Sequence, residues 1–303
     1  MNSDILKNSI SKLKEEKDAI VLAHYYVDGD VQEIADFVGD SYYLSQKALE
    51  SDNKIIVFCG VHFMAESAKI LSPHKTVLMP DSSADCPMAH MVTPKEIKKA
   101  REDYDDLAVV CYINSTAQIK ALSDVCVTSA NAVNIVKNLK EENIFFIPDK
   151  NLGQYVASQV PDKNIFSNDG CCPVHNILTK NCINEAIASN PDALVLAHPE
   201  CSFDILEMAD FIGSTTSIIE YVSSSKHNSF IICTEVGILH QLNKEGKNKN
   251  FHLFNEQQVC QDMKKITLEK VYNSLVSLEP EIHVNNDISL KAKTALEMMH
   301  KLA

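Results

Sequence analysis

The segment 35–41 reads ADFVGDS, and the segment 209–215 reads ADFIGST. Each copy follows an apolar run that ends in a polar cluster, HYY at residues 24–26 and HPE at residues 198–200. Two segments that match both in themselves and in what precedes them indicate an internal repeat. Such a repeat constrains the whole fold, because each copy is expected to form the same structural unit.

A third and more diverged copy lies between these two, at residues 122–129 (LSDVCVTS). The polar residues that close the preceding apolar runs lie 88 and 86 residues apart: His24, Tyr112 and His198. A small hydroxyl residue follows each of them after 17 residues: Ser41, Ser129 and Thr215. The chain therefore contains three units with a period of about 87 residues.

Short apolar runs alternate with amphipathic segments along the chain. The runs predict strands at residues 19–23, 54–59, 76–79, 107–112, 143–147, 164–166, 193–197, 229–233 and 250–254. The amphipathic segments predict helices at residues 31–38, 41–50, 63–71, 130–139, 202–211 and 287–302. The strands are rich in Val, Ile, Leu and Phe without alternation, which is typical of parallel strands buried on both faces. We expect an α/β protein of three homologous three-layer αβα domains with short parallel sheets, arranged with pseudo-threefold symmetry around a central site.

The repeat also predicts where the domains divide. The first domain is expected to combine residues 1–81 with the terminal helices of residues 267–303. The second is expected to span residues 82–170 and the third residues 171–266. The last helix-like segment has no strand after it, so we expect it to pack back on an earlier unit.

Composition restricts the partners of the chain. Its 303 residues carry 28 Lys and Arg against 41 Asp and Glu, a net charge of −13. Such acidity argues against a nucleic-acid or anionic-membrane partner, because phosphates recruit a basic surface. No apolar run approaches the roughly 18 residues that span a bilayer. Residues 1–17 are polar and helical in pattern, unlike a signal peptide, so we expect a cytoplasmic protein.

The chain has ten cysteines, and the expected reducing compartment argues against a disulfide framework. One cysteine follows the third strand of each unit, at spacings of 86 and 88 residues: Cys86, Cys172 and Cys260. Ligands of parallel sheets lie beyond the carboxyl ends of the strands, so the three thiols are expected to converge there. Thiolates favour a soft metal centre, and a structural zinc would normally have four ligands. Three cysteines instead suit a 4Fe–4S cluster with one open iron, which can act as a Lewis acid.

The other cysteines are expected to be packing residues. Free cysteine is among the most buried residue types, and these lie in apolar strands or helices: Cys59, Cys111, Cys126, Cys182, Cys201 and Cys233. Cys201 follows the HPE cluster and could lie near the site. Cys171 would give uneven spacings of 85 and 89 residues, so the repeat favours its neighbour Cys172 as a ligand. A redox role of Cys171 or Cys201 stays open.

Polar residues at the ends of the first strands are the other candidates for the site. Loops that follow parallel strands carry function, so we expect most of these residues to face one pocket: His24, Tyr26, Tyr112, Asn114, His198 and Glu200. Ser41, Ser129 and Thr215 are interpreted either as helix N-caps or as parts of an anion site at helix N-termini. Both interpretations can hold together.

Many dispersed motifs carry a resemblance to one family. They are HYY at 24–26, GVHFMAESAKIL at 60–71, PD at 80–81, CPM at 86–88, YIN at 112–114, TSANA at 128–132, PD at 148–149, LG at 152–153, CPVH at 172–175, HPEC at 198–201, GST at 213–215, TEVG at 234–237 and Cys260 before Met263 and Lys264. Over nearly its whole length the chain resembles the quinolinate synthase family.

The resemblance implies a three-domain protein with an oxygen-labile 4Fe–4S cluster held by Cys86, Cys172 and Cys260. It implies the condensation of iminoaspartate with dihydroxyacetone phosphate to quinolinate, with loss of phosphate and water, for NAD biosynthesis. It also implies transient coupling to the oxidase that supplies iminoaspartate. Residues matching those around the substrate are His24, Tyr26, Tyr112, Asn114, His175, His198 and Glu200. Residues matching those that hold carboxylate or phosphate oxygens are Ser41, Ser129, Ser214 and Thr215.

Catalysis of this kind needs general acids and bases with different pKa values, which His, Tyr and Glu supply. We expect Glu200, with Tyr26 or His198, to move protons, and His24 and Tyr112 to belong to the same catalytic set. The chain departs from the family in having Asp262 where Asn is frequent. Some members continue from the last ligand in a C-x-x-C-x-x-C pattern, but this chain has only Cys260 there and lacks that thiol–disulfide switch.

Three other functions compete with this one. Another hydro-lyase with an open-iron cluster would share the ligand set but not the product. A non-catalytic iron–sulfur sensor would need an output surface, and the sequence shows no basic DNA-binding helix. A zinc-stabilised structural protein is disfavoured by the number of ligands.

Overall fold

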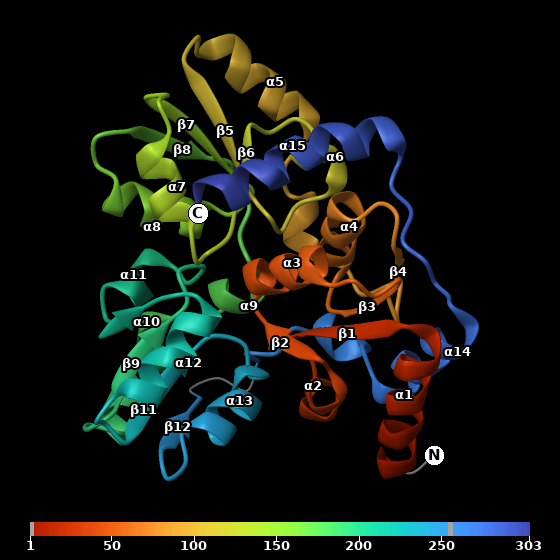
Figure 1. Ribbon diagram of the computed structural model, residues 1–303. Helices are drawn as coiled ribbons and strands as arrows, with labels where there is room; N and C mark the ends of the chain where they lie inside the picture. The colour runs from red at the N-terminus through yellow and green to blue at the C-terminus, as the bar shows by residue number, and fades with distance from the viewer. Residues whose placement is uncertain (1–2, 254–256) are drawn as a thin grey trace.

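The computed structural model describes residues 3–253 and 257–303, and Figure 1 shows its strands gathered in three separate groups. In the described residues each group is a four-stranded parallel sheet. The first, in the order β2-β1-β3-β4, consists of β1 (Ala19–His24), β2 (Phe37–Gly39), β3 (Ile55–Cys59) and β4 (Thr76–Leu78). The second, in the order β6-β5-β7-β8, consists of β5 (Leu107–Tyr112), β6 (Val125–Val127), β7 (Asn143–Ile147) and β8 (Asn164–Ser167). The third, in the order β10-β9-β11-β12, consists of β9 (Leu194–Ala197), β10 (Phe211–Ile212), β11 (Ser229–Cys233) and β12 (Asn250–His252).

Helices flank each sheet. Those of the first unit are α1 (Ser3–Lys17), α2 (Gly29–Ile34), α3 (Ser41–Glu50) and α4 (His62–Leu71). Around the second sheet lie α5 (Pro94–Asp103), α6 (Ala117–Lys120), α7 (Ala132–Asn138) and α8 (Lys150–Gln159), and around the third lie α10 (Lys180–Ser189), α11 (Phe203–Leu206), α12 (Thr215–Ser224) and α13 (Ile238–Glu245). Short turns connect the units: η1 (Pro87–His90), α9 (Pro173–Asn176) and η2 (Met263–Lys265). The chain ends in α14 (Leu268–Ser277) and α15 (Asn286–Leu302).

One carboxylate in each unit repeats the same contact with the first strand. Asp36, Asp124 and Asp210 stand just before the short strands β2, β6 and β10. Their Oδ2 atoms accept hydrogen bonds from the backbone N–H groups of Val21, Val109 and Val195, at 2.8, 2.7 and 2.8 Å. The carboxylates therefore fix where each second element joins its first strand, and their spacings of 88 and 86 residues equal those of the repeat.

One lysine in each unit closes the end of a helix. Lys75, Lys163 and Lys249 precede the last strand of their sheets. Each ammonium donates to two backbone carbonyls at or just beyond the C-terminal ends of α3, α7 and α12. A cation is favourable at a helix C-terminus, where the carbonyls carry partial negative charge. We call these residues the clamp lysines, and each holds a helix that begins near the centre of the molecule.

The predicted fold class is confirmed, with three similar αβα units built on parallel sheets. The nine predicted strands are present, with ends that differ by at most two residues; the predicted end at Phe254 lies outside the described residues. Two helix predictions were too long, because segments 31–38 and 202–211 each break after a short helix and continue into an edge strand, β2 or β10. The prediction also missed β6, which like the other two has at most three residues.

The terminal helices close the molecule. Helix α14 packs on α1 and β3, whereas α15 packs on α4 of the first unit and on α6, α7 and β6 of the second. Figure 1 shows α15 running across the junction of these two units. The division into domains stays a prediction, since α15 contacts both neighbours. Among the described residues, no helix combines the length and the apolar character needed to span a lipid bilayer.

Candidate active site

A cavity of about 280 Å³ lies where the three units meet. Strands β1, β5 and β9 end at or just before His24, Tyr112 and His198, and all three residues line it. The carboxyl ends of parallel strands point the same way, so three sheets can direct these loops to one place. Every residue predicted for the site lines the cavity except Ser214: His24, Tyr26, Ser41, Cys86, Tyr112, Asn114, Ser129, Cys172, His175, His198, Glu200, Thr215 and Cys260.

The three predicted cysteines occupy equivalent positions in the cavity wall. Cys86 and Cys172 stand directly before the turns η1 and α9, and Cys260 stands shortly before η2. Burial raises the pKa of each thiol, that of Cys260 to about 11, while backbone N–H groups two or three residues further on act in the opposite direction. All three cysteines line the same cavity.

This donor set fits an iron–sulfur cluster. Clusters are held by cysteine thiolates, and hydrogen bonds to the sulfurs tune them. Here three thiols face one cavity, and each is approached by the backbone N–H groups of its own turn. A structural zinc would need a fourth ligand beside these three.

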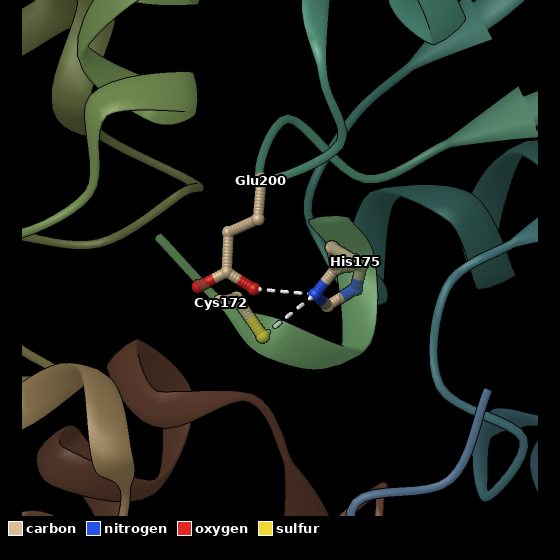
Figure 2. A group of neighbouring side chains, drawn as sticks. All are labelled: Cys172, His175 and Glu200. Atoms are coloured by element: carbon tan, nitrogen blue, oxygen red, sulfur yellow. Dashed lines mark hydrogen bonds and ion pairs between the residues drawn. The ribbon is translucent and has the colours of Figure 1, made fainter. Parts of the chain in front are cut away.

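His175, Glu200 and Cys172 form a tight polar group on one wall (Figure 2). His175 Nδ1 lies 2.8 Å from Glu200 Oε2 and 3.2 Å from Cys172 Sγ. Burial alone would raise the pKa of Glu200, but the charge of His175 and hydrogen bonds from His175 and Tyr112 lower it to about 2. Glu200 is therefore a carboxylate at neutral pH, and the group offers ligand atoms within 4.8 Å of one another that could hold a metal ion.

A chain of hydrogen bonds connects Tyr26 to this group. The Tyr26 hydroxyl lies 3.0 Å from Thr215 Oγ1 and 2.7 Å from Thr234 Oγ1. Thr234 Oγ1 in turn lies 2.9 Å from His175 Nε2. Burial, and next the charge of Glu200, raise the pKa of Tyr26 well above its usual value, so its hydroxyl is protonated. A continuous series of polar contacts therefore connects Glu200 to Tyr26.

His24 and His198 make the same hydrogen bond in the first and third units. Nδ1 of His24 accepts from the backbone N–H of Tyr26 at 3.1 Å, and Nδ1 of His198 accepts from that of Glu200 at 3.3 Å. Burial lowers the pKa of both imidazoles to about 3, so they are neutral near pH 7. A neutral ring whose Nδ1 accepts must carry its hydrogen on Nε2. His198 directs this Nε2 to Ser129 Oγ at 3.1 Å, so each ring offers a neutral donor at the cavity.

The structure contradicts one of the two interpretations of Ser41, Ser129 and Thr215, namely that they are helix N-caps. Ser41 and Thr215 are the first residues of α3 and α12, and the caps are Asp40 and Ser214. Ser129 lies in the turn before α7, so the N-cap interpretation was wrong for all three. Ser214 accepts from the backbone N–H of Ser217 and does not line the cavity. Free N–H groups at these helix starts leave the anion-site interpretation standing.

Three buried residues of the second and third units were missed as site residues: Asp149, Thr234 and Glu235. Asp149 and Glu235 both stand two residues after a central strand, β7 or β11, and are 86 residues apart. Applying the repeat to the ends of these strands would have found them. The first unit has Val61 at this position, so no polar pattern runs through all three copies.

The remaining cysteines mostly pack in the interior. Cys59, Cys111, Cys126, Cys201 and Cys233 are buried, and Cys182 is half-buried at the start of α10. Among the described residues that line the cavity, neither Cys171 nor Cys201 appears. Asp262, the departure from the family pattern, lines the cavity and accepts from Lys265 Nζ at 2.7 Å.

Comparison with known proteins identifies the family of the chain. The family described as quinolinate synthetase A protein matches residues 8–301. A protein of Fusobacterium nucleatum subsp. nucleatum named quinolinate synthase is 54% identical over 298 residues, covering 98% of this chain and 99% of its own. Proteins of the same name from Clostridium perfringens and Caldicellulosiruptor bescii are each 50% identical, covering 98% and 99% of this chain and 99% of their own. The chain therefore belongs to the quinolinate synthetase A family of enzymes.

Proposed function

We propose that the chain condenses iminoaspartate with dihydroxyacetone phosphate to quinolinate, releasing phosphate and water, as a cytoplasmic step of NAD biosynthesis. The observation that carries the proposal is the convergence of three repeat-related cysteines on one cavity that also holds Tyr26, His175 and Glu200. Family membership supports the same reaction.

Cys86, Cys172 and Cys260 would hold a 4Fe–4S cluster. When bound, the cluster supplies an open iron that acts as a Lewis acid on substrate oxygens. The donor set supports this cofactor, because three thiols supplied with backbone N–H groups leave one coordination position for a substrate.

The polar residues would bind and orient two anionic substrates. N–H groups at the starts of α3 and α12, with the hydroxyls of Ser41, Ser129 and Thr215, are suited to carboxylate and phosphate oxygens. The neutral His24 and His198 can donate from Nε2 to carbonyl or hydroxyl oxygens without adding charge. A net acidic protein can therefore receive anions through local donors alone.

Glu200 would be the base that moves protons during isomerisation and dehydration. Its low pKa keeps it ionised, and His175 and Tyr112 hold its carboxylate. Tyr26, with its raised pKa, would serve as the complementary donor across the Thr234 link. These roles place acid and base on opposite ends of one hydrogen-bonded chain.

The test is anaerobic purification with iron, sulfide and product analysis of the chain and its variants. Cys86→Ala, Cys172→Ala and Cys260→Ala should each lose the cluster, and a full cluster in all three would refute the ligand set. Glu200→Gln should keep the cluster spectrum and abolish turnover. Normal formation of quinolinate by that variant would remove Glu200 from the catalytic set.

The product assay also separates the alternatives. Another open-iron hydro-lyase would bind the cluster but form no pyridine dicarboxylate. A non-catalytic sensor would show no spectral change when substrates are added. Transient coupling to the oxidase that supplies iminoaspartate is part of the proposal, and faster quinolinate formation with the oxidase present than with free iminoaspartate would support it.

A further inference from the structure

Glu235 is a fully buried carboxylate at the meeting point of two units and a cluster-ligand segment. Its Oε1 accepts from the backbone N–H of Cys260 at 3.1 Å, and its Oε2 accepts from that of Gly237 at 2.6 Å. Lys264 Nζ lies 3.2 Å from the same Oε1. One side chain thus joins the end of β11 to the segment that carries the third cysteine.

Lys264 extends this contact to the first unit. Its ammonium donates to the carbonyl oxygen of Tyr26 at 2.7 Å and lies 3.6 Å from Asp28 Oδ1. Tyr26 stands two residues after the end of β1, so Lys264 holds the backbone that presents the Tyr26 hydroxyl to the cavity. We call Glu235, Lys264 and the Tyr26 carbonyl the Glu235–Lys264 junction.

The backbone around the junction is packed too closely for a larger residue. A Cβ added at Gly237 would lie 2.7 Å from both the Tyr25 carbonyl oxygen and the Tyr26 Cα. Gln32 Nε2 bridges the same contact, donating to the carbonyls of Tyr25, Val27 and Gly237. The first and third units are therefore held in register at this point by contacts of defined geometry.

A buried carboxylate is a costly way to stabilise a fold. Burial raises the pKa of Glu235, and Lys264 only partly opposes this shift. Replacing a buried ion pair with apolar residues is often neutral or stabilising in proteins. The equivalent position of the second unit also carries a carboxylate, Asp149, which interacts with the backbone N–H of Cys172. Placement of the cysteine segments explains both carboxylates better than stability does.

We infer that the Glu235–Lys264 junction is a positioning device that sets Cys260 and Tyr26 relative to each other. The inference rests on the proposed function for its catalytic consequence but not for its structural one. Neither junction side chain is expected to react with substrate; they act through the backbone N–H of Cys260 and the carbonyl of Tyr26.

The test uses the full chain, purified anaerobically, with Glu235→Ala, Glu235→Gln and Lys264→Met. The matched control is Asp210→Asn, which alters a carboxylate of the same unit that also accepts a backbone N–H but lies away from the cavity. Amide hydrogen exchange in residues 257–266 should be faster in Glu235→Ala and Lys264→Met than in the parent, and exchange in the second sheet should not change. Glu235→Gln, which keeps the size and one acceptor oxygen, should fall between.

Two further readouts tie the junction to the site. Release of iron to a chelator should be about 10- to 100-fold faster in Glu235→Ala, and kcat should fall by a similar factor. Asp210→Asn should change neither. Unchanged exchange in residues 257–266 of Glu235→Ala would overturn the inference, as would an equal change in Asp210→Asn. If the parent chain holds no iron or forms no quinolinate, the proposed function fails, and hydrogen exchange still decides on the junction.

Discussion

Removal of the clamp lysine of the second unit tests whether this repeated contact stabilises the helix that it closes. Lys163 Nζ donates to the carbonyl oxygens of Leu139 and Glu141, at 2.8 Å each. Hydrogen bonds to charged groups are worth about 1.5–3 kcal/mol, and half-buried carbonyls regain part of this from water. Taking about 1 kcal/mol for each bond, Lys163→Met should weaken the end of α7 by about 2 kcal/mol.

Hydrogen exchange is the assay of choice, because a chain of three units need not unfold in one step. A loss of about 2 kcal/mol corresponds to roughly 30-fold faster exchange in α7. The matched control is Lys137→Met, which removes an exposed lysine from the last turn of the same helix. It should lose only the interaction with the helix dipole, at most about 1 kcal/mol. Equal exchange rates in the two variants would refute the role of the clamp.

Three further changes have defined outcomes. Thr234→Val should lower kcat by about 10- to 100-fold with little change in KM, because it breaks the link from Tyr26 to His175. Thr234→Ser keeps the hydroxyl and should retain most of the parent kcat. An unchanged kcat in the Val variant would contradict the link. Burial lowers the pKa of Lys120, so between this lowered pKa and about pH 10.4 the unfolded state binds more protons than the folded state, and stability rises with pH. Lys120→Met should therefore be more stable than the parent near pH 8 in urea unfolding, with a gain that shrinks as pH rises. Gly237→Ala should reduce turnover while circular dichroism shows the sheets intact, and full activity would contradict the close contact.

The sequence predicted the architecture where hydrophobic pattern and repeat spacing agreed. Strands such as β1, β5 and β9 are continuous apolar runs, and their spacing located both the polar strand ends and the cysteines. The edge strands β2, β6 and β10 were missed because two or three residues carry too little pattern to separate a strand from the helix before it.

Most of the predicted residues line the cavity, but their connections were not predicted. The repeat predicted that Tyr26 and Glu200 would face one pocket, and the resemblance implied the same for His175. The bonds through Thr234, in contrast, depend on side-chain directions that only packing decides. Glu235 was missed for a related reason: its partners, Cys260 and Lys264, lie 25 and 29 residues further along the chain.

The position two residues after β3, β7 and β11 differs in character between the three units, with Val61 in the first, Asp149 in the second and Glu235 in the third. A cavity built from three identical copies would look the same from each unit, and it could not distinguish one end of a substrate from the other. Val61, beside Phe63, gives one wall an apolar surface that the other two copies do not repeat at this position. The divergence of the copies therefore makes the cavity unsymmetrical, so that the two ends of an unsymmetrical ligand would meet different walls.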